Sequence, residues 1–149
     1  MRNALVSLLL LIAVPSQAVE PTPFRWPSHE AIPARISDGA VIANISLDAW
    51  QSLYKTDLRT RRDYLCRLVL TTGLSELSKA VIHRTRPNGA DMQSFWSEHT
   101  AIASMAARSP LSASLAVTVG WGRLASGAHY QTDVGVGATI GLIARRVCR

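Results

Sequence analysis

The chain has 149 residues, of which 48% are hydrophobic and 17% are charged, so it can build a hydrophobic core and lacks the composition of a disordered tail. Lysine and arginine outnumber aspartate and glutamate by 16 to 10, which gives a net charge of +6 and favours an anionic partner. One compact domain is expected, and charge alone does not choose between nucleic acid, a lipid headgroup surface and a phosphorylated small molecule.

The first residues are organised like a secretory signal. Arg2 precedes an apolar run, and a small-x-small pattern ends at Ala18, which predicts cleavage after that residue. The alternative for residues 1–18 is an uncleaved N-terminal anchor helix. Both interpretations place the rest of the chain outside the cytoplasm, in the periplasm or secreted. There Cys66 and Cys148 form either one disulfide or two separate buried thiols.

Residues 19–40 contain four prolines, at positions 21, 23, 27 and 33. Proline removes a backbone donor and interrupts helices, so this density predicts an extended arm laid over the domain. The helical domain is expected to occupy residues 41–149.

From residue 41 onwards, apolar residues recur at spacings of three and four, and no alternating strand pattern of useful length appears. This periodicity predicts an all-α fold, a bundle of about five helices. The helices are expected near 41–55, 60–84, 98–108, 110–125 and 133–147. One buried face is expected to comprise Ile42, Ile45, Ala49, Leu53, Leu65, Leu68, Val69, Leu77 and Val81.

None of these helices has the roughly twenty apolar residues that a bilayer requires, which favours a soluble or peripheral domain. The basic segment 55–67 suits contact with an anionic membrane surface, but Asp57 and Asp63 interleave with its arginines. A solvated charged face is the favoured interpretation of that segment. The chain carries neither a nucleic-acid motif nor interleaved aromatics, so no nucleic-acid partner is expected.

Three stretches carry chemistry-bearing side chains. In "KAVIHRTRP", Lys79 lies near a predicted helix end and Arg86 precedes a proline that holds it extended. In "SFWSEHTA", Ser97 occupies an N-cap position, so the amides of Glu98 and His99 project from a helix N-terminus that suits an anion. Each stretch also has a purely structural interpretation, as a solvated helix end and as an ordinary cap.

The third stretch, "GRLASGAHYQTD", places His129 and Asp133 four residues apart. On a helix these two side chains share one face, where a carboxylate can hold one imidazole nitrogen and leave the other free. Such a pair taken alone is usually structural.

Together the three stretches resemble the signature of the type 2 phosphatidic acid phosphatase superfamily, which also contains class A bacterial acid phosphatases and vanadium haloperoxidases. The resemblance covers residues 79–141. It rests on Lys79 six residues before Arg86-Pro87, on Ser97-x-His99, on Arg123 five residues before His129, and on Asp133 three residues further on. The "GATIG" of residues 137–141 is similar to the family's small-residue helix.

The resemblance implies a helical bundle in which all three motifs surround one phosphate. Three cations, Lys79, Arg86 and Arg123, would bind the phosphate oxygens, and Ser97 with the amides of Glu98 and His99 would complete the cradle. Fixed cations and donors of this kind stabilise the charge of a phosphoryl-transfer transition state. The remaining cations of the first stretch, His83 and Arg84, fall outside the pattern and are expected to be helix-end charges.

The resemblance also implies the catalytic roles. His129 would attack phosphorus, with Asp133 orienting it, and His99 would protonate the leaving oxygen and then activate water. No metal or other cofactor is implied, because the basic side chains neutralise the phosphate. The substrate would be a phosphomonoester or pyrophosphate, including a lipid phosphate.

The sequence departs from the family pattern at three positions. Trp96 and Glu98 replace the proline and glycine of the second motif, and Gly122 replaces the serine of the third. Trp96 is either a core residue, which is favoured, or an apolar wall for a lipid tail. The Glu98 carboxylate can face solvent, and the alternative is that it restricts substrate size or reduces activity. The alternatives are a degenerate member that binds phosphate or a phospholipid headgroup without turnover, and a vanadium haloperoxidase. The shortness of the chain makes a homo-oligomer a further expectation.

Overall fold

The computed structural model describes residues 31–54 and 57–149, and every regular element within those ranges is helical. The elements are α2 Ala31–Ala49, the π-helical segment η1 Trp50–Tyr54, α3 Leu58–Val81, α4 Glu98–Ala106, α5 Pro110–Ala125 and α6 Gln131–Val147. The predicted all-α class of five helices is confirmed. The signal or anchor over 1–18 and most of the arm lie outside the described residues.

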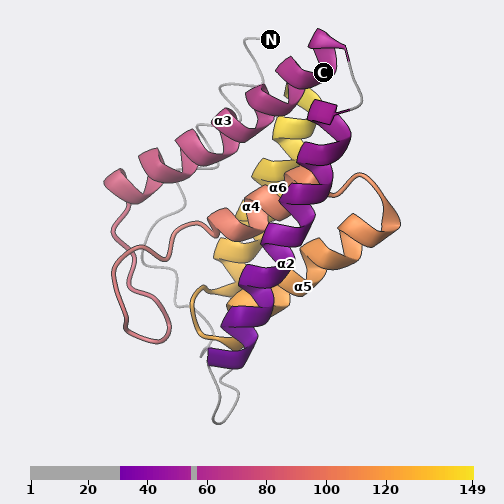
Figure 1. Cartoon of the computed structure of the whole chain (residues 1–149). Coiled ribbons are helices and arrows are strands. Elements are labelled where there is room, and N and C mark those ends of the chain that lie inside the picture. The colour runs from indigo at the N-terminus through magenta and orange to yellow at the C-terminus, as the bar shows by residue number, and fades with distance from the viewer. Residues whose placement is uncertain (1–30, 55–56) are drawn as a thin grey trace.

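The short helix α4 lies at the centre of the bundle (Figure 1). It packs against α2, α3, α5 and α6, and most of its residues are fully buried. Figure 1 shows α2 running along the length of the molecule and α3 crossing it obliquely. The irregular loop 82–97 connects α3 to α4, and a short loop over 126–130 connects α5 to α6.

The expected extended arm over 19–40 is wrong for residues 31–40, which form the first half of α2. Pro33 is the third residue of this helix. A proline in the first turn keeps a helical φ, and its missing N–H has no intrahelical acceptor to lose, so it is compatible with a helix start there. The expected helix over 41–55 therefore begins ten residues earlier and its α-helical part ends at Ala49.

The predicted helix starts at α4 and α5 are confirmed. The Ser97 hydroxyl accepts from the Thr100 amide, and the Ser109 hydroxyl accepts from the Ser112 amide, with Pro110 as the first residue of α5. These caps satisfy donors that a helix N-terminus otherwise leaves unpaired.

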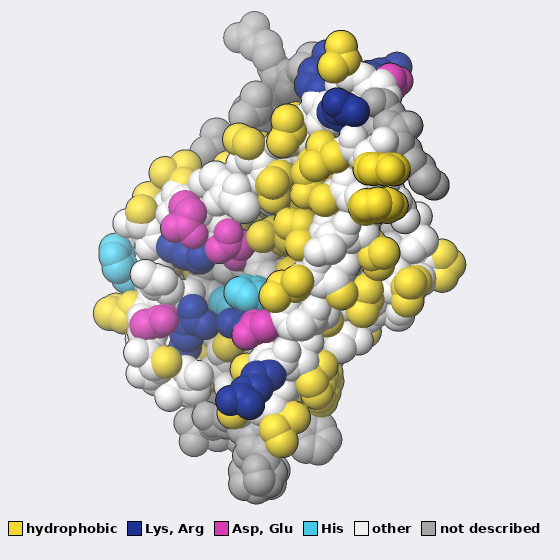
Figure 2. Space-filling view, viewed as in Figure 1, with side chains coloured by type: hydrophobic (Ala, Val, Ile, Leu, Met, Phe, Trp, Pro, Cys, Tyr) yellow, Lys and Arg dark blue, Asp and Glu magenta, His cyan; other side chains and the backbone are white. Residues whose placement is uncertain are grey.

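The predicted buried face of the first two helices is mostly wrong, because small and polar side chains point inwards. The predicted core residues that are in fact exposed are Ile42, Leu53, Leu65, Val69, Leu77 and Val81, and Figure 2 shows apolar side chains spread over this surface. The buried positions of α2 include Ser37 and Asn44. The Asn44 side-chain amide donates to the carbonyl oxygens of Ala103 and Ser112, so its polarity is satisfied.

Two glycines allow α6 to lie directly against α4. A Cβ at Gly137 would collide with the Ser97 carbonyl, and a Cβ at Gly141 would collide with the Ala101 carbonyl. The backbones therefore approach closely only because both positions lack a side chain. This contact fixes the start of α6 beside the N-terminus of α4.

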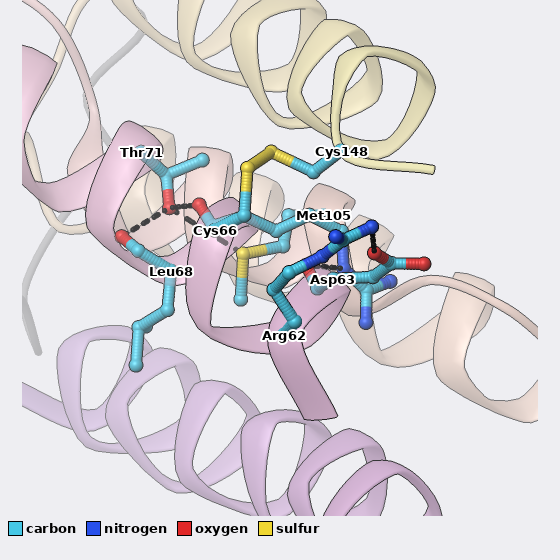
Figure 3. Close-up of a disulfide and its surroundings, with 8 residues drawn as sticks. Arg62, Asp63, Cys66, Leu68, Thr71, Met105 and Cys148 are labelled. Carbon is cyan, nitrogen blue, oxygen red and sulfur yellow. Dashed lines mark hydrogen bonds and ion pairs between the residues drawn. A yellow bond between two sulfur atoms is a disulfide. The ribbon is translucent and has the colours of Figure 1, made fainter. Parts of the chain in front are cut away.

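One disulfide joins Cys66 on α3 to Cys148 after α6 (Figure 3). Of the two states left open for these cysteines, the structure has the disulfide. It closes a loop of 82 residues, which in the chain-entropy model stabilises the fold by up to about 4 kcal/mol. Among the described helices, none is both long enough and apolar enough to cross a membrane.

Candidate active site

His129 lies in the loop before α6, and its ring orientation is set by a backbone carbonyl. Its Nδ1 lies 2.7 Å from the carbonyl oxygen of Ser94. Because a carbonyl only accepts, Nδ1 carries the hydrogen and Nε2 keeps its lone pair. Burial, followed by the charge of Arg123, lowers the pKa of His129 to about 3. The imidazole is therefore neutral at physiological pH, which is the state a nucleophile requires.

Asp133 is fully buried in the first turn of α6, where it caps the helix. Its Oδ2 accepts from the Ser94 hydroxyl at 2.5 Å and from the Tyr130 amide at 3.1 Å. Burial raises its pKa, while these donors and the Arg84 guanidinium act in the opposite direction. The carboxylate thus organises the loop around the histidine.

The direct bond expected between Asp133 and His129 is absent. The distance between Asp133 Oδ2 and His129 Nδ1 is 4.0 Å, too long for a hydrogen bond. Ser94 connects the two residues, because its hydroxyl donates to Asp133 and its carbonyl accepts from His129. Asp133 therefore orients the imidazole through Ser94, which the sequence analysis did not single out.

Arg84 is not a helix-end charge, so that prediction is wrong. The helix α3 ends at Val81, and the Arg84 Nη1 donates to Asp133 Oδ1 at 2.5 Å and to the Thr132 hydroxyl at 3.0 Å. Its guanidinium also stacks over the Tyr130 ring, 4.2 Å from the centroid. Arg84 therefore neutralises the buried carboxylate behind His129 and has a structural role beside the site.

Arg123 and His99 meet at a carboxylate from α2. Asp38 Oδ1 lies 3.2 Å from Arg123 Nη1 and 3.3 Å from His99 Nε2. Burial and the charge of Arg123 lower the pKa of His99, and Asp38 partly opposes them. Asp38 was missed by the sequence analysis, because it lies 61 and 85 residues from the side chains it contacts and carries no motif.

The Arg123 guanidinium is only partly satisfied. The residue is 8% exposed, and its Nε has no hydrogen-bond acceptor among the described residues. A buried charged donor without a partner is costly. An anion that accepts from this nitrogen would remove that cost, and the charges of Arg123, Arg86 and His99 all act on His129. The charges of Arg123 and Arg86 therefore make the surroundings of His129 electropositive.

The Glu98 carboxylate does not face open solvent; it pairs with Lys79. Its Oε2 lies 2.6 Å from Lys79 Nζ, and Glu76 holds the same ammonium at 2.8 Å. Burial alone would lower the pKa of Lys79, but the hydrogen bonds to Glu76 and Glu98 raise it overall. Lys79 is therefore charged and already paired with two carboxylates.

Arg86 is held in the loop before α4. Its Nε donates to Asp91 Oδ1 at 2.6 Å, and its Nη1 reaches the Ala128 carbonyl at 3.5 Å, one residue before His129. The loop is closed by a bond from the Arg86 amide to the Asp91 carbonyl. Asp91 is a further residue that sequence reasoning missed.

Ser97 forms its hydrogen bonds within the protein, to Thr100 and to Asp133. Its hydroxyl shares a hydrogen bond with the Thr100 hydroxyl at 2.9 Å, and its amide donates to the Asp133 carbonyl at 3.1 Å. The latter bond joins the N-terminus of α4 to the first turn of α6. The amides of Glu98 and His99 begin α4 and lack intrahelical acceptors, as expected.

The three sequence motifs thus converge at the N-termini of α4 and α6. On the face in Figure 2, cationic, acidic and histidine side chains gather in one band. Within the described residues, no group of three His, Cys, Asp or Glu side chains is arranged to hold a metal ion. Searches against protein-family models, curated proteins and solved structures found no match for this chain.

Proposed function

We propose that this protein is a phosphatase that hydrolyses a phosphomonoester or pyrophosphate through a phosphohistidine at His129, in the manner of the type 2 phosphatidic acid phosphatases. One observation carries the proposal. His129 is neutral, its Nδ1–H donates a hydrogen bond to the Ser94 carbonyl, and the positive charges of Arg123 and Arg86 act on it. A neutral imidazole with a free Nε2, surrounded by cations, is suited to attack an anionic phosphoryl group.

The proposed reaction has two displacements at phosphorus. In the first, the Nε2 lone pair of His129 forms the P–N bond while the P–O bond to the leaving group breaks, and the imidazolium form of His99 gives its proton to that oxygen. In the second, His99 takes a proton from water, the water oxygen bonds to phosphorus, and the P–N bond breaks. Arg123, Arg86 and Lys79 bind the oxygens that carry charge in both transition states.

The carboxylates in the site determine which phosphate groups can bind. Asp38 holds Arg123 and His99, Glu98 holds Lys79, and Asp91 holds Arg86. A phosphate group must compete with these carboxylates for the cations, so a dianion, or a group with several phosphate oxygens, is favoured over a monoanion. Arg123 Nε is buried and has no acceptor among the described residues, so a phosphate that reaches it displaces no carboxylate there.

A lipid phosphate is the substrate class best supported within this proposal. The molecule has a large exposed apolar surface, and such surfaces are typical of contact with lipid or protein. The disulfide supports an extracytoplasmic location, because disulfides persist in oxidising compartments. We therefore expect phosphatidate or an isoprenyl diphosphate to be hydrolysed faster than a soluble ester.

Binding without turnover is the second candidate. It is favoured by the contact of 3.3 Å between Asp38 Oδ1 and His99 Nε2, which holds the proposed acid. If the substrate does not displace this carboxylate, the leaving oxygen is not protonated. The site would then hold a phosphate group and release it unchanged.

The test is phosphate release in EDTA from p-nitrophenyl phosphate, phosphatidate and an isoprenyl diphosphate. The variant is His129→Asn, whose amide can still donate to Ser94, and the matched control is His83→Ala, an exposed histidine of the same chain. The proposal expects vanadate-sensitive release from wild type and the control, and a loss of at least about 10³-fold in His129→Asn. Equal release from His129→Asn would overturn it, whereas vanadate binding without release from any substrate would select the binding function.

A further inference from the structure

A second basic cluster lies at the far end of the bundle from His129. A cavity of about 120 Å³ opens where the start of α3 meets the ends of α4 and α6. Its wall contains four arginines: Arg67, Arg108, Arg145 and Arg149. The 17 residues of α6 separate it from the phosphatase motifs, which corresponds to about 25 Å at the helical rise.

The carboxylates nearby do not balance these arginines. Asp48 is fully buried and pairs with Arg108 at 3.1 Å and with Arg67 at 3.6 Å. One negative charge thus serves two guanidinium groups. Within the described residues, Arg145 and Arg149 form no ion pair with a carboxylate, so the cavity keeps a net positive charge.

Asp63 also lines the cavity, but it is engaged by Arg62 on the outer side of α3 at 3.7 Å. Figure 3 shows this pair beside the disulfide. The charge of Asp63 is therefore shared with a cation outside the cavity wall. It reduces the positive potential of the cavity without cancelling it.

The arginines repel one another. Burial, followed by the charges of Arg149, Arg67 and Arg108, lowers the pKa of Arg145. Like charges held together in a folded protein destabilise it unless an anion joins them. Hydrogen bonds account for part of the cluster, since Arg145 Nη1 donates to the Ala107 carbonyl and Arg67 Nε donates to the Asp63 carbonyl. Those bonds satisfy donors and remove no charge.

The size of the cavity limits the ligand. A volume of about 120 Å³ is well above the roughly 10–15 Å³ that a cavity needs to hold one water. That space suits a single tetrahedral anion, either free or as the head of a larger molecule that remains outside. Planar guanidinium forks bind pairs of phosphate oxygens particularly well.

We propose that this cavity is a second anion-binding site, which takes a phosphate group between Arg67, Arg108, Arg145 and Arg149. The site does not depend on the phosphatase motifs and stands if the proposed activity fails. The disulfide fixes its geometry, because Cys148 lies between Arg145 and Arg149 and is bonded to Cys66 on the helix that carries Arg67. A phosphate bound there joins the ends of α3, α4 and α6.

Backbone NMR of the ¹⁵N-labelled protein separates the two sites in one titration with inorganic phosphate. The proposal expects saturable shift changes around residues 145–149, in addition to any at the amides of Glu98 and His99. Arg149→Gln is the first variant, because this exposed side chain can be changed without disturbing the core. It should weaken binding at the cavity by about 10- to 150-fold, the usual range for a charge-assisted hydrogen bond.

Two variants serve as controls. Arg146→Gln removes an equal charge from the same helix at an exposed position outside the cavity wall, and it should leave the cavity shifts unchanged. Arg123→Gln should reduce the shifts at Glu98 and His99 only. The proposal is overturned if phosphate leaves residues 145–149 unmoved, if chloride at equal ionic strength moves them equally, or if Arg146→Gln weakens binding as much as Arg149→Gln.

A second arm identifies the source of the phosphate. Short-chain phosphatidate below its micelle concentration replaces inorganic phosphate in the same titration. Tighter binding of the lipid at residues 145–149 indicates a headgroup ligand, and equal or weaker binding indicates a free phosphate. With either ligand, we expect the shift changes at residues 145–149 to be lost in Arg149→Gln. If the lipid still shifts these residues equally in that variant, the proposed site is wrong.

Discussion

Carboxylates pair with the cations of the candidate active site and compete with phosphate for them. Lys79 illustrates this pairing, because it contacts Glu98 and Glu76 at similar distances, 2.6 and 2.8 Å. The two acids differ in position: the Glu98 side chain is 23% exposed and begins α4, whereas the Glu76 side chain is 69% exposed on the outside of α3. They therefore form a natural matched pair.

Glu98→Gln should strengthen phosphate binding, because it removes the carboxylate that competes with phosphate for Lys79. We expect the inhibition constant for phosphate to fall by about 2- to 5-fold, as for a partly exposed ion pair. Glu76→Gln should change it by less than about twofold. Equal effects of the two variants would mean that Glu98 acts only through net charge.

Asp38 should tune the pKa of His99, the proposed general acid. Its carboxylate raises the pKa of His99, although burial and Arg123 keep that pKa below the usual value. Removing the charge in Asp38→Asn should therefore lower the pKa of His99 further, and NMR titration of the imidazole measures it directly. An unchanged or higher pKa would contradict the contact between Asp38 and His99.

At the residue level, the sequence indicated the side chains within the motifs and missed their partners. The charges of Arg86 and Arg123 act on His129, and the charge of Lys79 acts on His99. Each motif spacing is a local signal that indicates which residues share a helix end or loop. Asp38 and Ser94 come from other segments, and their contacts with the site depend on how α2 and the loop 82–97 pack. No local pattern encodes that packing.

At the scale of the elements, the position of α2 depends on one glycine. A Cβ at Gly122 would lie 2.6 Å from the Pro33 carbonyl and 2.7 Å from Ser37 Cβ. This close contact gives a physical reason for the glycine where the resembled motif has serine. It also brings Asp38, one residue after Ser37, to His99 and Arg123.

Gly122→Ala should displace α2 and destabilise the fold by about 1–3 kcal/mol, the usual range for overpacking. Gly135→Ala is the matched control, because no atom lies within 4 Å of a Cβ there, and it should stabilise α6 by about 0.5–1 kcal/mol. Urea unfolding measures both values. A neutral Gly122→Ala variant would show that α2 does not pack against α5 as described.

The helices themselves were predicted better than their faces. Capping residues placed the starts of α4 and α5 correctly, because a cap is a local signal. The start of α2 was missed, since Pro33 indicates an interruption unless it falls in a first turn. The faces of α2 and α3 were inverted, because the helical period shows that two faces differ but does not show which one packs against α4.

For the whole molecule, the buried neutral imidazole of His129 makes the free energy of unfolding depend on pH. The folded protein lowers the pKa of His129 from 6.5 to about 3. Between those values the unfolded chain binds a proton that the folded state does not, so the free energy of unfolding falls as the pH drops. The contribution is at most about 1.4 kcal/mol per pH unit.

His129→Asn should therefore flatten the decline of stability between pH 6.5 and pH 4, because asparagine does not titrate. Urea unfolding of wild type and variant across this range measures the difference. A decline of the same slope in both proteins would mean that His129 titrates alike in the folded and unfolded states and would contradict the lowered pKa of the buried imidazole.

The most direct test of the central claim, that His129 is the nucleophile, is to trap the phosphoenzyme. Wild type and His99→Ala are mixed with a ³²P-labelled phosphate ester, quenched in alkali and digested, and the labelled peptide is identified. The account predicts an alkali-stable, acid-labile label on His129 in wild type, and a label that decays more slowly once formed in His99→Ala because water is no longer activated. Label on any other residue, or turnover without label on His129 in either protein, would contradict it.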